Sequence, residues 1–480
     1  MIIVAITGPT LREALNQIRA SSRFADMFEC RLDLISGFDL RQLLRSTRRP
    51  ALVTCRPQWE GGAFAGSEDE RMAILSEAAD LGAQYIDLEA KIGPRRVREF
   101  KKRHRGVRVI VSQHHFGPDT PDPRRAFNAL RKLNAFAVKL AFESTDARDI
   151  AVVARFLGYA RRSKVRAIAV AMGEAGESSR ILYRRFGGWA TFAAAELGAS
   201  SAPGQIPASI MKTLYSAGRL TPKTKIFGLV GNPVRYSRGI LLFNPLFQKA
   251  KINAVYCRFA VEDLQGFMAD VSSEIAGLSV TKPHKQEIMK YLAEMDESSA
   301  GIGAVNTLLR KQQRFCGANT DAAGALDAIE EKMPVRGRSM LVLGAGGTAR
   351  AIAWEAIRRG ATILITNRTH ERAVALAESL GASAVLLENI HKADIVANAT
   401  SSGMTPQEEN TPLPAGSVQM KLAFDAVYNP VETRFLREAR MAGAETVSGL
   451  EMYIHQAARQ FFLFTGKRIS IAKVRRIIER

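Results

Sequence analysis

The sequence predicts an α/β protein that begins with a (β/α)8 TIM barrel and continues as a second α/β series containing a Rossmann dinucleotide-binding unit. Three observations predict this class. Short apolar strand patterns alternate eight times with helical patterns over residues 1–210. The alternation breaks at residues 216–223, a stretch that holds Gly, Thr and Pro. A glycine-rich turn then joins an apolar strand to a helix after residue 340.

The eight strand patterns indicate a closed barrel. Helical patterns lie between them, for instance at residues 68–81 and 146–160. An open doubly wound sheet is the alternative topology, but a count of eight favours the barrel, which places active-site residues at the carboxyl ends of its strands. The expected strands are residues 2–7, 28–34, 51–56, 84–90, 107–114, 136–142, 166–172 and 190–195.

Composition is that of a soluble globular protein, with 46% hydrophobic and 24% charged residues among 480. Residues 1–7 read as a first strand rather than a signal peptide, and no apolar run reaches membrane-spanning length. Four cysteines lack Cys-x-x-Cys spacing, which argues against a zinc site or a disulfide framework. We therefore expect a cytoplasmic protein with no metal and no membrane partner.

The net charge of +21, from 68 basic and 47 acidic residues, makes nucleic-acid binding an alternative class. The basic runs at residues 95–98 and 101–105 lie in helical patterns and lack interleaved aromatic residues. A solvated basic face is favoured, so we expect no nucleic-acid partner. Salt-sensitive binding that disappears when residues 95–105 are neutralised would indicate the alternative.

Lys139 lies in an otherwise apolar strand pattern, where an ammonium group is costly unless it is paired or its pKa is lowered. A lowered pKa suits an imine-forming lysine, because only the neutral amine attacks a carbonyl. The alternative is a strand-end lysine that reaches solvent. His114 and His115 end another strand and suit proton transfer at neutral pH, with a carboxylate such as Glu60 to orient the ring.

Arginines lie at or after the ends of three other strand patterns, at Arg31, Arg56 and Arg180. If they converge, they suit an anionic substrate held by bidentate pairing. One of them would otherwise form a structural ion pair with Glu29 or Glu60. These residues together favour imine-based proton abstraction in a barrel, without naming the substrate.

Residues 1–210 resemble type I 3-dehydroquinate dehydratase. The resemblance implies that Lys139 forms an imine with the C3 ketone, that His114 is the general acid/base, and that Glu60 supports it. His114 fits the family pattern Ser-x-His-polar-Phe, in which His115 takes the polar place. Substrate-binding roles are implied for Glu29, Arg31, Arg56, Arg180, Ser201 and Gln205. The strings that carry the resemblance are Phe28-Glu-Cys-Arg-Leu-Asp33, Arg56 with Glu60-Gly-Gly62, Ser112-Gln-His-His-Phe116, Val138-Lys-Leu140, Met172-Gly with Ser179-Arg180, and Ser201-Ala-Pro-Gly-Gln205.

The glycine-rich turn begins at Gly344 and is followed by a helical pattern with apolar residues at 353, 356 and 357. Such a turn lets the backbone approach a pyrophosphate at a helix N-terminus. The next strand pattern, residues 361–366, ends in Asn367-Arg368-Thr369 instead of the acidic residue that binds the NAD ribose. An arginine there pairs with a 2′-phosphate, so the predicted cofactor is NADP.

Between the break and this turn, Lys282, Lys285 and His284 compete for a catalytic role at the end of a strand pattern, and Asp321 follows later. A Lys–Asp pair beside NADP would assist hydride transfer by proton donation. The alternatives are a structural salt bridge for the pair and turn chemistry for Asn306.

Residues 225–470 resemble shikimate dehydrogenase. The resemblance implies that Lys285 and Asp321 are the catalytic pair. It implies substrate contacts for Ser237, Thr281, Asn306, Tyr428 and Gln456, and cofactor contacts for Gly344, Ala345, Gly346, Gly347, Thr348, Ala349, Asn367, Arg368, Thr369, Thr400 and Gly449. The matching strings are Ser279-Val-Thr-Lys-Pro-His-Lys285, Gly303-Ala-Val-Asn-Thr307, Asn319-Thr-Asp321, the Gly344 turn, Asn367-Arg-Thr369, Asn398-Ala-Thr-Ser-Ser-Gly-Met404, Asp425-Ala-Val-Tyr-Asn-Pro430 and Gly449-Leu-Glu-Met452 with Gln456-Ala-Ala458.

One string departs from the second family. Its usual Ser-x-Ser-Pro-x-x-His-Asn reads Ser237-Arg-Gly-Ile-Leu-Leu-Phe-Asn244 here, so Gly239 replaces the second serine and Phe243 the histidine. Loss of one hydroxyl donor costs roughly 0.5–3 kcal/mol of carboxylate binding. Arg235 or Arg238 is the hypothetical replacement, and an altered preference such as quinate is the alternative.

The predicted domains are a dehydratase barrel (residues 1–215), a linker (216–224), a substrate domain (225–330), an NADP-binding Rossmann domain (331–448) and a C-terminal helical segment (449–480) that packs back on the dehydrogenase. The two halves resemble consecutive shikimate-pathway catalysts, and their order is similar to fusions of plants and chlamydia-type bacteria. The resemblance implies that the first half dehydrates 3-dehydroquinate to 3-dehydroshikimate and that the second half reduces this product to shikimate with NADPH. We therefore expect small-molecule substrates: 3-dehydroquinate, and 3-dehydroshikimate or shikimate. A dehydrogenase-like domain that only senses NADP is the rival reading, and no oligomeric state is predicted.

Overall fold

A computed structural model describes residues 1–117, 119–198 and 200–479. By its contacts the chain divides into two compact units, Met1–Ile275 and Ala276–Arg480. Among the described residues, no helix has both the length and the apolar character needed to cross a bilayer.

The first unit begins with the predicted barrel. All eight expected strands are present, and their ends differ from the expected ones by at most three residues. The sheet order is β7-β6-β5-β4-β3-β2-β1-β8, so β1 pairs in parallel with both the second and the eighth strand. An open doubly wound sheet does not bring its last strand beside its first, so the barrel prediction is confirmed. The strands are β1 (Ile2–Ile6), β2 (Met27–Arg31), β3 (Ala51–Thr54), β4 (Tyr85–Glu89), β5 (Arg108–His115), β6 (Ala137–Glu143), β7 (Arg166–Met172) and β8 (Thr191–Ala194).

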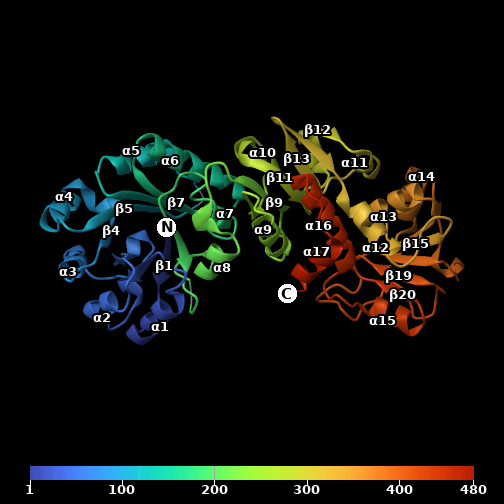
Figure 1. Ribbon diagram of the computed structural model, residues 1–480, viewed down its shortest axis with the longest axis horizontal. Coiled ribbons are helices and arrows are strands. Elements are labelled where there is room, and N and C mark those ends of the chain that lie inside the picture. Colours follow the sequence, from blue (N-terminus) through green and yellow to red (C-terminus); the bar gives the residue numbers. More distant parts are fainter. Residues whose placement is uncertain (118, 199, 480) are drawn as a thin grey trace. The chain divides into compact units, whose positions relative to one another are not determined.

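Helices surround these strands (Figure 1). The prediction at residues 68–81 corresponds to α3, which begins after a capping box in which Ser67 and Glu70 satisfy each other's backbone N–H groups. The basic runs lie on and just after α4, whose buried side chains are Val97 and Phe100. The barrel helices are α1 (Leu11–Ser21), α2 (Leu40–Arg45), α3 (Glu68–Asp80), α4 (Gly93–Arg103), α5 (Pro123–Arg131), α6 (Ile150–Arg162), α7 (Glu177–Ile181) and α8 (Ala208–Thr213).

The first unit ends with a short βαβα segment. A 3-10 turn, η5 (Ala217–Arg219), precedes it, and its two strands pair in parallel from Ala254 opposite Lys225 to Ala260 opposite Gly231. The segment contains β9 (Lys225–Gly231), α9 (Gly239–Lys249), β10 (Ala254–Ala260) and α10 (Leu264–Asp270).

The second unit opens with a small mixed sheet in the order β11-β13-β14-β12, in which β13 is antiparallel to both neighbours. Its strands are β11 (Ile275–Val280), β12 (Leu292–Met295), β13 (Thr307–Lys311) and β14 (Arg314–Ala318). Two helices belong to this part, α11 (Glu297–Ile302) and α12 (Thr320–Glu330).

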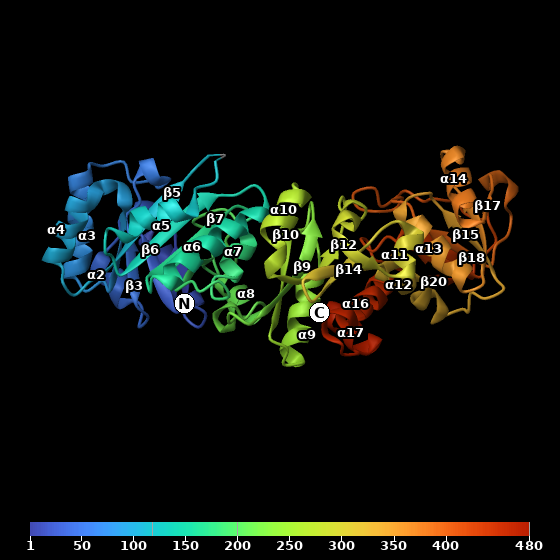
Figure 2. The ribbon, with the colours of Figure 1, turned by 90° about the horizontal axis from the view of Figure 1, so that it is seen from above.

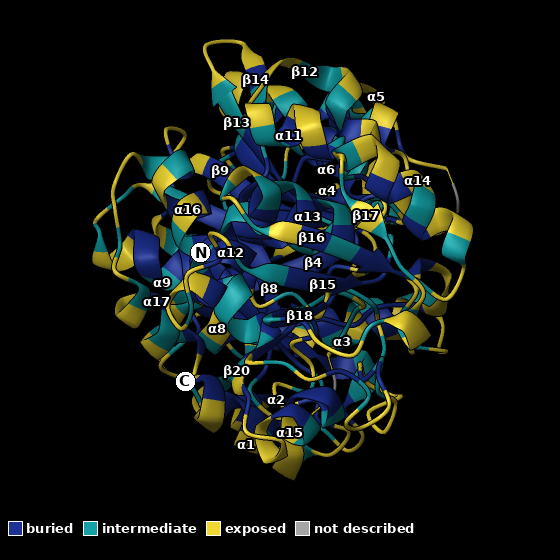
Figure 3. Cartoon of the chain, turned by 90° about the vertical axis from the view of Figure 1, so that its right-hand side faces the viewer, coloured by how far each residue is buried: buried dark blue, intermediate teal, exposed yellow. Residues whose placement is uncertain are grey.

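A parallel sheet with the order β17-β16-β15-β18-β19-β20 follows, and this is the Rossmann arrangement that the glycine-rich turn predicts. Its strands β15 and β18 are almost wholly buried and appear dark blue in Figure 3. The strands are β15 (Ser339–Leu343), β16 (Thr362–Thr366), β17 (Ser383–Ala384), β18 (Ile395–Asn398), β19 (Leu422–Asp425) and β20 (Glu445–Val447). The helices are α13 (Gly347–Arg358), α14 (His370–Leu380) and α15 (Arg434–Met441).

The C-terminal residues are helical, as expected. Both ribbon views show α17 (Ile471–Ile478) beside α16 (Gly449–Thr465) (Figures 1 and 2). Helix α16 packs along α12, so the end of the chain returns to the start of the second unit.

Candidate active sites

A cavity of about 380 Å³ opens at the carboxyl ends of the barrel strands. It brings together all nine residues that the first resemblance implicates: Glu29, Arg31, Arg56, Glu60, His114, Lys139, Arg180, Ser201 and Gln205. His115 is not among the lining residues, and its ring bonds to the Gln113 amide at 2.7 Å. The geometry therefore favours His114 over His115 as the ring that faces a substrate.

Lys139 lies on β6 and is only 6% exposed. Its Nζ is 3.8 Å from Asp87 Oδ2 and 4.2 Å from the centroid of the Phe192 ring. Burial lowers the pKa of this ammonium, and the nearby Asp87 carboxylate only partly opposes the change. The amine is thus easier to deprotonate than a solvent-exposed lysine, which suits attack on a carbonyl.

His114 is held by Glu60 through two hydrogen bonds. The backbone N–H of His114 donates to Glu60 Oε2 at 2.9 Å, and Nδ1 contacts the same oxygen at 2.7 Å. When Glu60 is ionised it can only accept, so the contact then requires the proton on Nδ1 and leaves Nε2 as the acceptor. Burial lowers the pKa of His114 well below 6.5, with a further contribution from Arg56, so the ring is neutral at pH 7. Burial also raises the pKa of Glu60 to about 7.

Glycines shape the turn that carries Glu60. Gly61 adopts a left-handed conformation with φ of +75°, and a Cβ there would lie 2.3 Å from the Phe116 ring. A Cβ on Gly62 would lie 2.1 Å from the Arg56 carbonyl oxygen. The close approach of Gly61 to the Phe116 ring and of Gly62 to the Arg56 backbone requires the two glycines after Glu60.

The three arginines converge on the cavity but differ in their partners. Arg31 forms a bidentate pair with Asp33 at 2.9 and 2.7 Å. Arg180 is 2% exposed, donates to the Pro203 carbonyl at 3.2 Å, and has no carboxylate partner among the described residues. Burial lowers the pKa of Arg180 to about 10. An unneutralised guanidinium in a cavity attracts an anionic substrate group.

Two carboxylates that the sequence analysis missed lie on β4. Arg56 pairs with Asp87 at 3.0 Å and with Glu89 at 2.6 Å, rather than with Glu29 or Glu60. Asp87 and Glu89 are two residues apart in a buried strand, so both face the barrel interior. Two acidic residues at that spacing in an apolar strand were the available signal.

The remaining predicted residues lie around the same cavity. Gln205 Nε2 donates to Ser201 Oγ at 2.8 Å, and Ser201 N donates back to Gln205 Oε1 at 3.1 Å. Glu29 accepts from Thr54 Oγ1 at 2.8 Å. These bonds fix polar groups of the cavity lining without neutralising Arg180.

In the second unit, Lys285 and Asp321 form the predicted pair. Lys285 Nζ donates to Asp321 Oδ2 at 2.6 Å, and both side chains stay partly exposed. Asp321 lies in the first turn of α12, which is capped by Asn319. Partial exposure leaves the ammonium accessible to a ligand while the carboxylate orients it.

Asn306 belongs to a buried hydrogen-bond network. It donates to Thr320 Oγ1 at 2.9 Å and accepts from Thr307 Oγ1 at 2.7 Å and Thr320 N at 2.9 Å. Thr320 also reaches Gln456 Oε1 at 3.4 Å, so Asn306 and Gln456 are joined through one hydroxyl. Thr281 caps the turn before Lys285, because its carbonyl accepts from His284 N at 3.0 Å. Tyr428 is 47% exposed.

Gly239 and Phe243, the two residues that differ from the family pattern, both contact Tyr256 in the first unit. A Cβ on Gly239 would lie 2.9 Å from Tyr256 Cε1 and 3.2 Å from its hydroxyl. Phe243 stacks on the same ring with centroids 4.6 Å apart. Asn244 fixes the tyrosine backbone by accepting from its N–H at 2.8 Å. Tyr256 thus fills the space that a side chain at position 239 would need.

Ser237 accepts a hydrogen bond from Gly239 N at 3.2 Å. The two arginines offered as replacements, Arg235 and Arg238, are not buried, and Arg235 lies over the Tyr236 ring. Arg258, which the sequence analysis did not consider, donates to the Ser237 carbonyl at 3.2 Å.

Restoring the family serine by Gly239→Ser is expected to lower the melting temperature by roughly 4–8 °C, because the Tyr256 ring is packed too tightly to yield. Differential scanning calorimetry measures the shift. Gly218→Ser is the matched control, since a Cβ there meets nothing within 4 Å, and it should leave the melting temperature unchanged. A Gly239→Ser variant as stable as the parent would contradict the packing argument.

The glycine-rich turn follows β15 as predicted. Gly344 has φ of +113°, which favours glycine, and a Cβ there would lie 3.1 Å from the Thr400 methyl group. Cβ atoms on Gly346 and Gly347 would meet nothing within 4 Å, so open space lies before the N-terminus of α13. Thr400 bonds to Asn398 Oδ1 through both its N–H and its hydroxyl. The turn therefore offers free backbone N–H groups to a phosphate.

Arg368 follows β16 and is exposed, with no hydrogen bond or ion pair to the residues that the structure describes. Asn367 fixes this corner by donating to the Thr369 carbonyl at 2.9 Å. Gly449 permits close contact of α16 with the end of β19, because a Cβ there would lie 2.5 Å from the Ala426 carbonyl oxygen.

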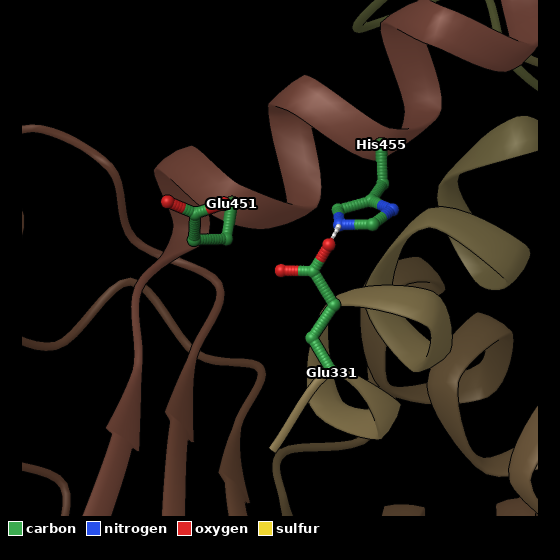
Figure 4. A group of neighbouring side chains, drawn as sticks. All are labelled: Glu331, Glu451 and His455. Carbon is green, nitrogen blue, oxygen red and sulfur yellow. Dashed lines mark ion pairs between the residues drawn. The ribbon is translucent and has the colours of Figure 1, made fainter. Parts of the chain in front are cut away.

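A separate group of titratable side chains lies where α16 meets the end of α12. Ligand atoms of Glu331, Glu451 and His455 are all within 4.8 Å of one another. His455 points at Glu331, at 3.2 Å (Figure 4). Arg475 of α17 contacts Glu451 at 2.6 Å and Glu331 at 3.5 Å. The Arg475 guanidinium therefore balances the negative charge of these carboxylates and attaches α17 to α16.

Four family matches cover most of the chain. Residues 2–221 match type I 3-dehydroquinase and residues 229–308 the shikimate dehydrogenase substrate binding domain. Residues 327–423 match shikimate/quinate 5-dehydrogenase and residues 449–479 the shikimate 5′-dehydrogenase C-terminal domain.

Known proteins resemble the whole chain or its second half. The chloroplastic bifunctional 3-dehydroquinate dehydratase/shikimate dehydrogenase of Arabidopsis thaliana is 38% identical over 496 residues, 96% of this chain and 82% of the relative. Shikimate dehydrogenase (NADP(+)) of Pyrococcus furiosus is 39% identical over 262 residues, 53% of this chain and 95% of the relative. The crystal structure of Thermus thermophilus shikimate 5-dehydrogenase with NADP(H) and shikimate has 34% identity and a TM-score of 0.51, covering 53% of this chain and 99% of that one.

Proposed function

Because the chain belongs to the family of bifunctional 3-dehydroquinate dehydratase/shikimate dehydrogenases, we propose that its barrel dehydrates 3-dehydroquinate and that its second half reduces the product, 3-dehydroshikimate, to shikimate. The observation that carries this proposal is the cavity around Lys139, which joins a buried amine, a neutral histidine and an unneutralised arginine. The domain boundaries proposed are those predicted from the sequence: residues 1–215, 216–224, 225–330, 331–448 and 449–480.

In the barrel, the Lys139 amine adds to the C3 ketone, and the adduct loses water to give a protonated imine, which draws electrons from the neighbouring carbon. His114 Nε2 then removes a proton from that carbon, and Glu60 stabilises the ring as it becomes charged. His114 afterwards returns the proton to the departing hydroxyl, which leaves as water. A further water molecule then hydrolyses the imine, which releases 3-dehydroshikimate and restores the Lys139 amine. Arg180 holds the substrate carboxylate, and Glu29, Arg31, Arg56, Ser201 and Gln205 bind the remaining polar groups.

In the dehydrogenase half, Lys285 donates a proton to the oxygen of the ketone as it is reduced, and Asp321 orients the ammonium. When bound, NADPH supplies the hydride. Ser237, Thr281, Asn306, Tyr428 and Gln456 bind the substrate. Cofactor contacts are proposed for Gly344, Ala345, Gly346, Gly347, Thr348, Ala349, Asn367, Arg368, Thr369, Thr400 and Gly449.

The choice of NADP rests on Arg368, whose exposed guanidinium is free to pair with a 2′-phosphate. Arg368→Ala is expected to narrow the preference for NADPH over NADH by roughly 10- to 100-fold, through a higher KM for NADPH. Steady-state kinetics with both cofactors measure the ratio. Arg372→Ala, on the following helix turn, is the matched control; an unchanged ratio in Arg368→Ala would reject the phosphate role.

The proposal as a whole is tested by supplying 3-dehydroquinate and NADPH to the full chain. Absorbance of the conjugated enone should appear first, and NADPH should then be consumed. Enone formation without NADPH loss, when cofactor binding is demonstrated, would support an NADP-sensing role instead. NADP-dependent oxidation of quinate faster than of shikimate would support the alternative that Gly239 suggests.

The cysteines bear on the cellular setting. All four are unpaired, which fits a reducing compartment such as the cytoplasm. The partners proposed are the small-molecule substrates and NADP(H), with no nucleic acid and no membrane.

A further inference from the structure

The loop after β6 forms part of the wall of the dehydratase cavity. Glu143 ends β6, the strand that carries Lys139, and it lines the cavity together with Ser144 and Thr145 of the following loop. Asp146 follows and caps a 3-10 turn, η4 (Ala147–Asp149), by accepting from Arg148 N at 2.7 Å. Ser144 Oγ donates to the Asp146 carbonyl at 3.0 Å. The position of Asp146 therefore sets that of the cavity wall.

The second carboxylate oxygen of Asp146 is bound by the dehydrogenase half. Oδ2 accepts from the backbone N–H groups of Glu262 at 2.7 Å and Asp263 at 2.9 Å. Both donors lie in the turn between β10 and α10. Hydrogen bonds to an ionised acceptor are stronger than neutral ones, so this oxygen is a firm attachment point.

Arg148 reinforces the attachment. Its guanidinium donates to Asp263 Oδ2 and, at 3.2 Å, to Asp270 Oδ2. A Cβ on Gly266 would lie 2.5 Å from Arg148 Nη1 and 2.3 Å from Asp263 Oδ2. The glycine therefore makes room for the guanidinium on α10.

The turn that holds Asp146 is also tied to the loop carrying Ser237. Val261 N donates to the Gly231 carbonyl at 3.1 Å, and Asn232 Nδ2 donates to Glu262 Oε1 at 3.2 Å. Gly231 and Asn232 begin the β9–α9 loop that leads to Ser237. A continuous set of contacts thus runs from the wall of one cavity to a substrate loop of the other half.

We propose that Asp146 is a positioning residue for the dehydratase: through it, the dehydrogenase half holds the loop of residues 143–146 in the conformation that binds 3-dehydroquinate. This inference rests on the dehydratase function proposed above. Asp146 bonds to none of Lys139, His114 and Glu60 among the contacts of the described chain, so its loss changes substrate binding rather than the chemical step.

Asp146→Asn isolates the attachment. The asparagine keeps one oxygen for Arg148 N but presents an NH₂ group, which cannot accept, to Glu262 and Asp263. In the full chain, KM for 3-dehydroquinate is expected to rise roughly 5- to 20-fold, with kcat within about twofold. Hydrogen exchange of the amides of residues 144–148 should also become faster, because the loop opens more often.

Two further variants make the result specific. Arg155 on α6 also contacts α10, through an ion pair with Asp270 at 2.6 Å, but among the described residues it does not bind the loop of residues 143–146. Arg155→Ala should therefore leave KM unchanged. Arg148→Ala weakens the attachment but keeps the cap, and should raise KM by roughly two- to fivefold, which keeps the test open if Asp146→Asn fails to fold.

An unchanged KM in a folded Asp146→Asn variant overturns the proposal, and so does an equal rise in Arg155→Ala. Faster exchange with an unchanged KM also overturns it, because the loop is then attached without positioning the substrate. Exchange does not depend on turnover. A parent enzyme that produces no enone would therefore refute the proposed dehydratase, and the exchange of residues 144–148 would still decide the attachment.

Discussion

Replacing Lys139 with alanine is expected to abolish enone formation from 3-dehydroquinate, with a fall in kcat of roughly 10⁴-fold or more, the scale of losing a covalent catalyst. The reason is that no other described amine lines the cavity to form the imine. NADPH consumption from 3-dehydroquinate should stop as well. It should resume when 3-dehydroshikimate is supplied, since the second half is untouched.

Burial of Lys139 makes a second variant necessary. Alanine leaves Asp87 without one of its cations, so Lys139→Met, which keeps the volume, separates lost chemistry from lost stability. Borohydride trapping adds a direct readout, because it reduces an imine and should attach the substrate to the parent chain alone. Lys132→Ala, at an exposed position after α5, is the matched control and should retain full activity. Enone formation that survives in Lys139→Met would refute the imine.

The pH dependence of the dehydratase follows from His114. Because burial lowers its pKa well below 6.5, the neutral base should persist as the pH falls through 6.5, and the rate should decline only at lower pH. In stability terms, a histidine with a lowered folded-state pKa stabilises the fold above its unfolded pKa and loses that contribution as the pH falls through the folded value. Glu60, whose pKa rises to about 7, contributes in the opposite sense: its stabilising contribution is lost as the pH rises through 7.

The strands and the glycine-rich turn were predictable because their signals are local. A continuous apolar run fixes β7 at Arg166–Met172, which are its expected bounds. The expected strand 28–34 ends early, at Arg31, because Leu32–Leu34 turn into a 3-10 helix. Leu32 and Leu34 continue the apolar pattern without continuing the strand, so the sequence carries no mark of that end.

Contacts between distant residues were not predictable in the same way. An ion pair of one arginine, such as Arg56, with Glu29 or Glu60 was the alternative expected from the sequence. The partners of Arg56 are instead Asp87 and Glu89 on β4, which the strand pattern did not identify as site residues. Asp146 and Glu262 are 116 residues apart, and neither belongs to a motif. The glycine at position 239 is explained only by its contact with Tyr256. Gly239 begins α9, and the absence of a side chain there leaves room for the Tyr256 ring of β10.

Replacing Lys285 with alanine is expected to lower kcat for 3-dehydroshikimate reduction by roughly 10²- to 10⁴-fold, because the developing alkoxide loses its proton donor. Dehydratase activity should be unchanged, so 3-dehydroquinate should be converted to an enone that accumulates while NADPH persists. That pattern is the reverse of the one expected for Lys139→Ala, and the two variants mixed together should restore NADPH consumption.

Lys282 provides the matched control for this experiment. It lies three residues earlier in the same turn and is exposed, whereas Lys285 bonds to Asp321 at 2.6 Å. Lys282→Ala should therefore retain kcat, and Asp321→Asn should lower it less than Lys285→Ala, since the carboxylate orients the donor and does not replace it. An unchanged KM for NADPH in all three would show that the cofactor site is intact. A Lys285→Ala variant with full kcat, or a larger loss in Lys282→Ala, would move the proton donor from Lys285 to its neighbour.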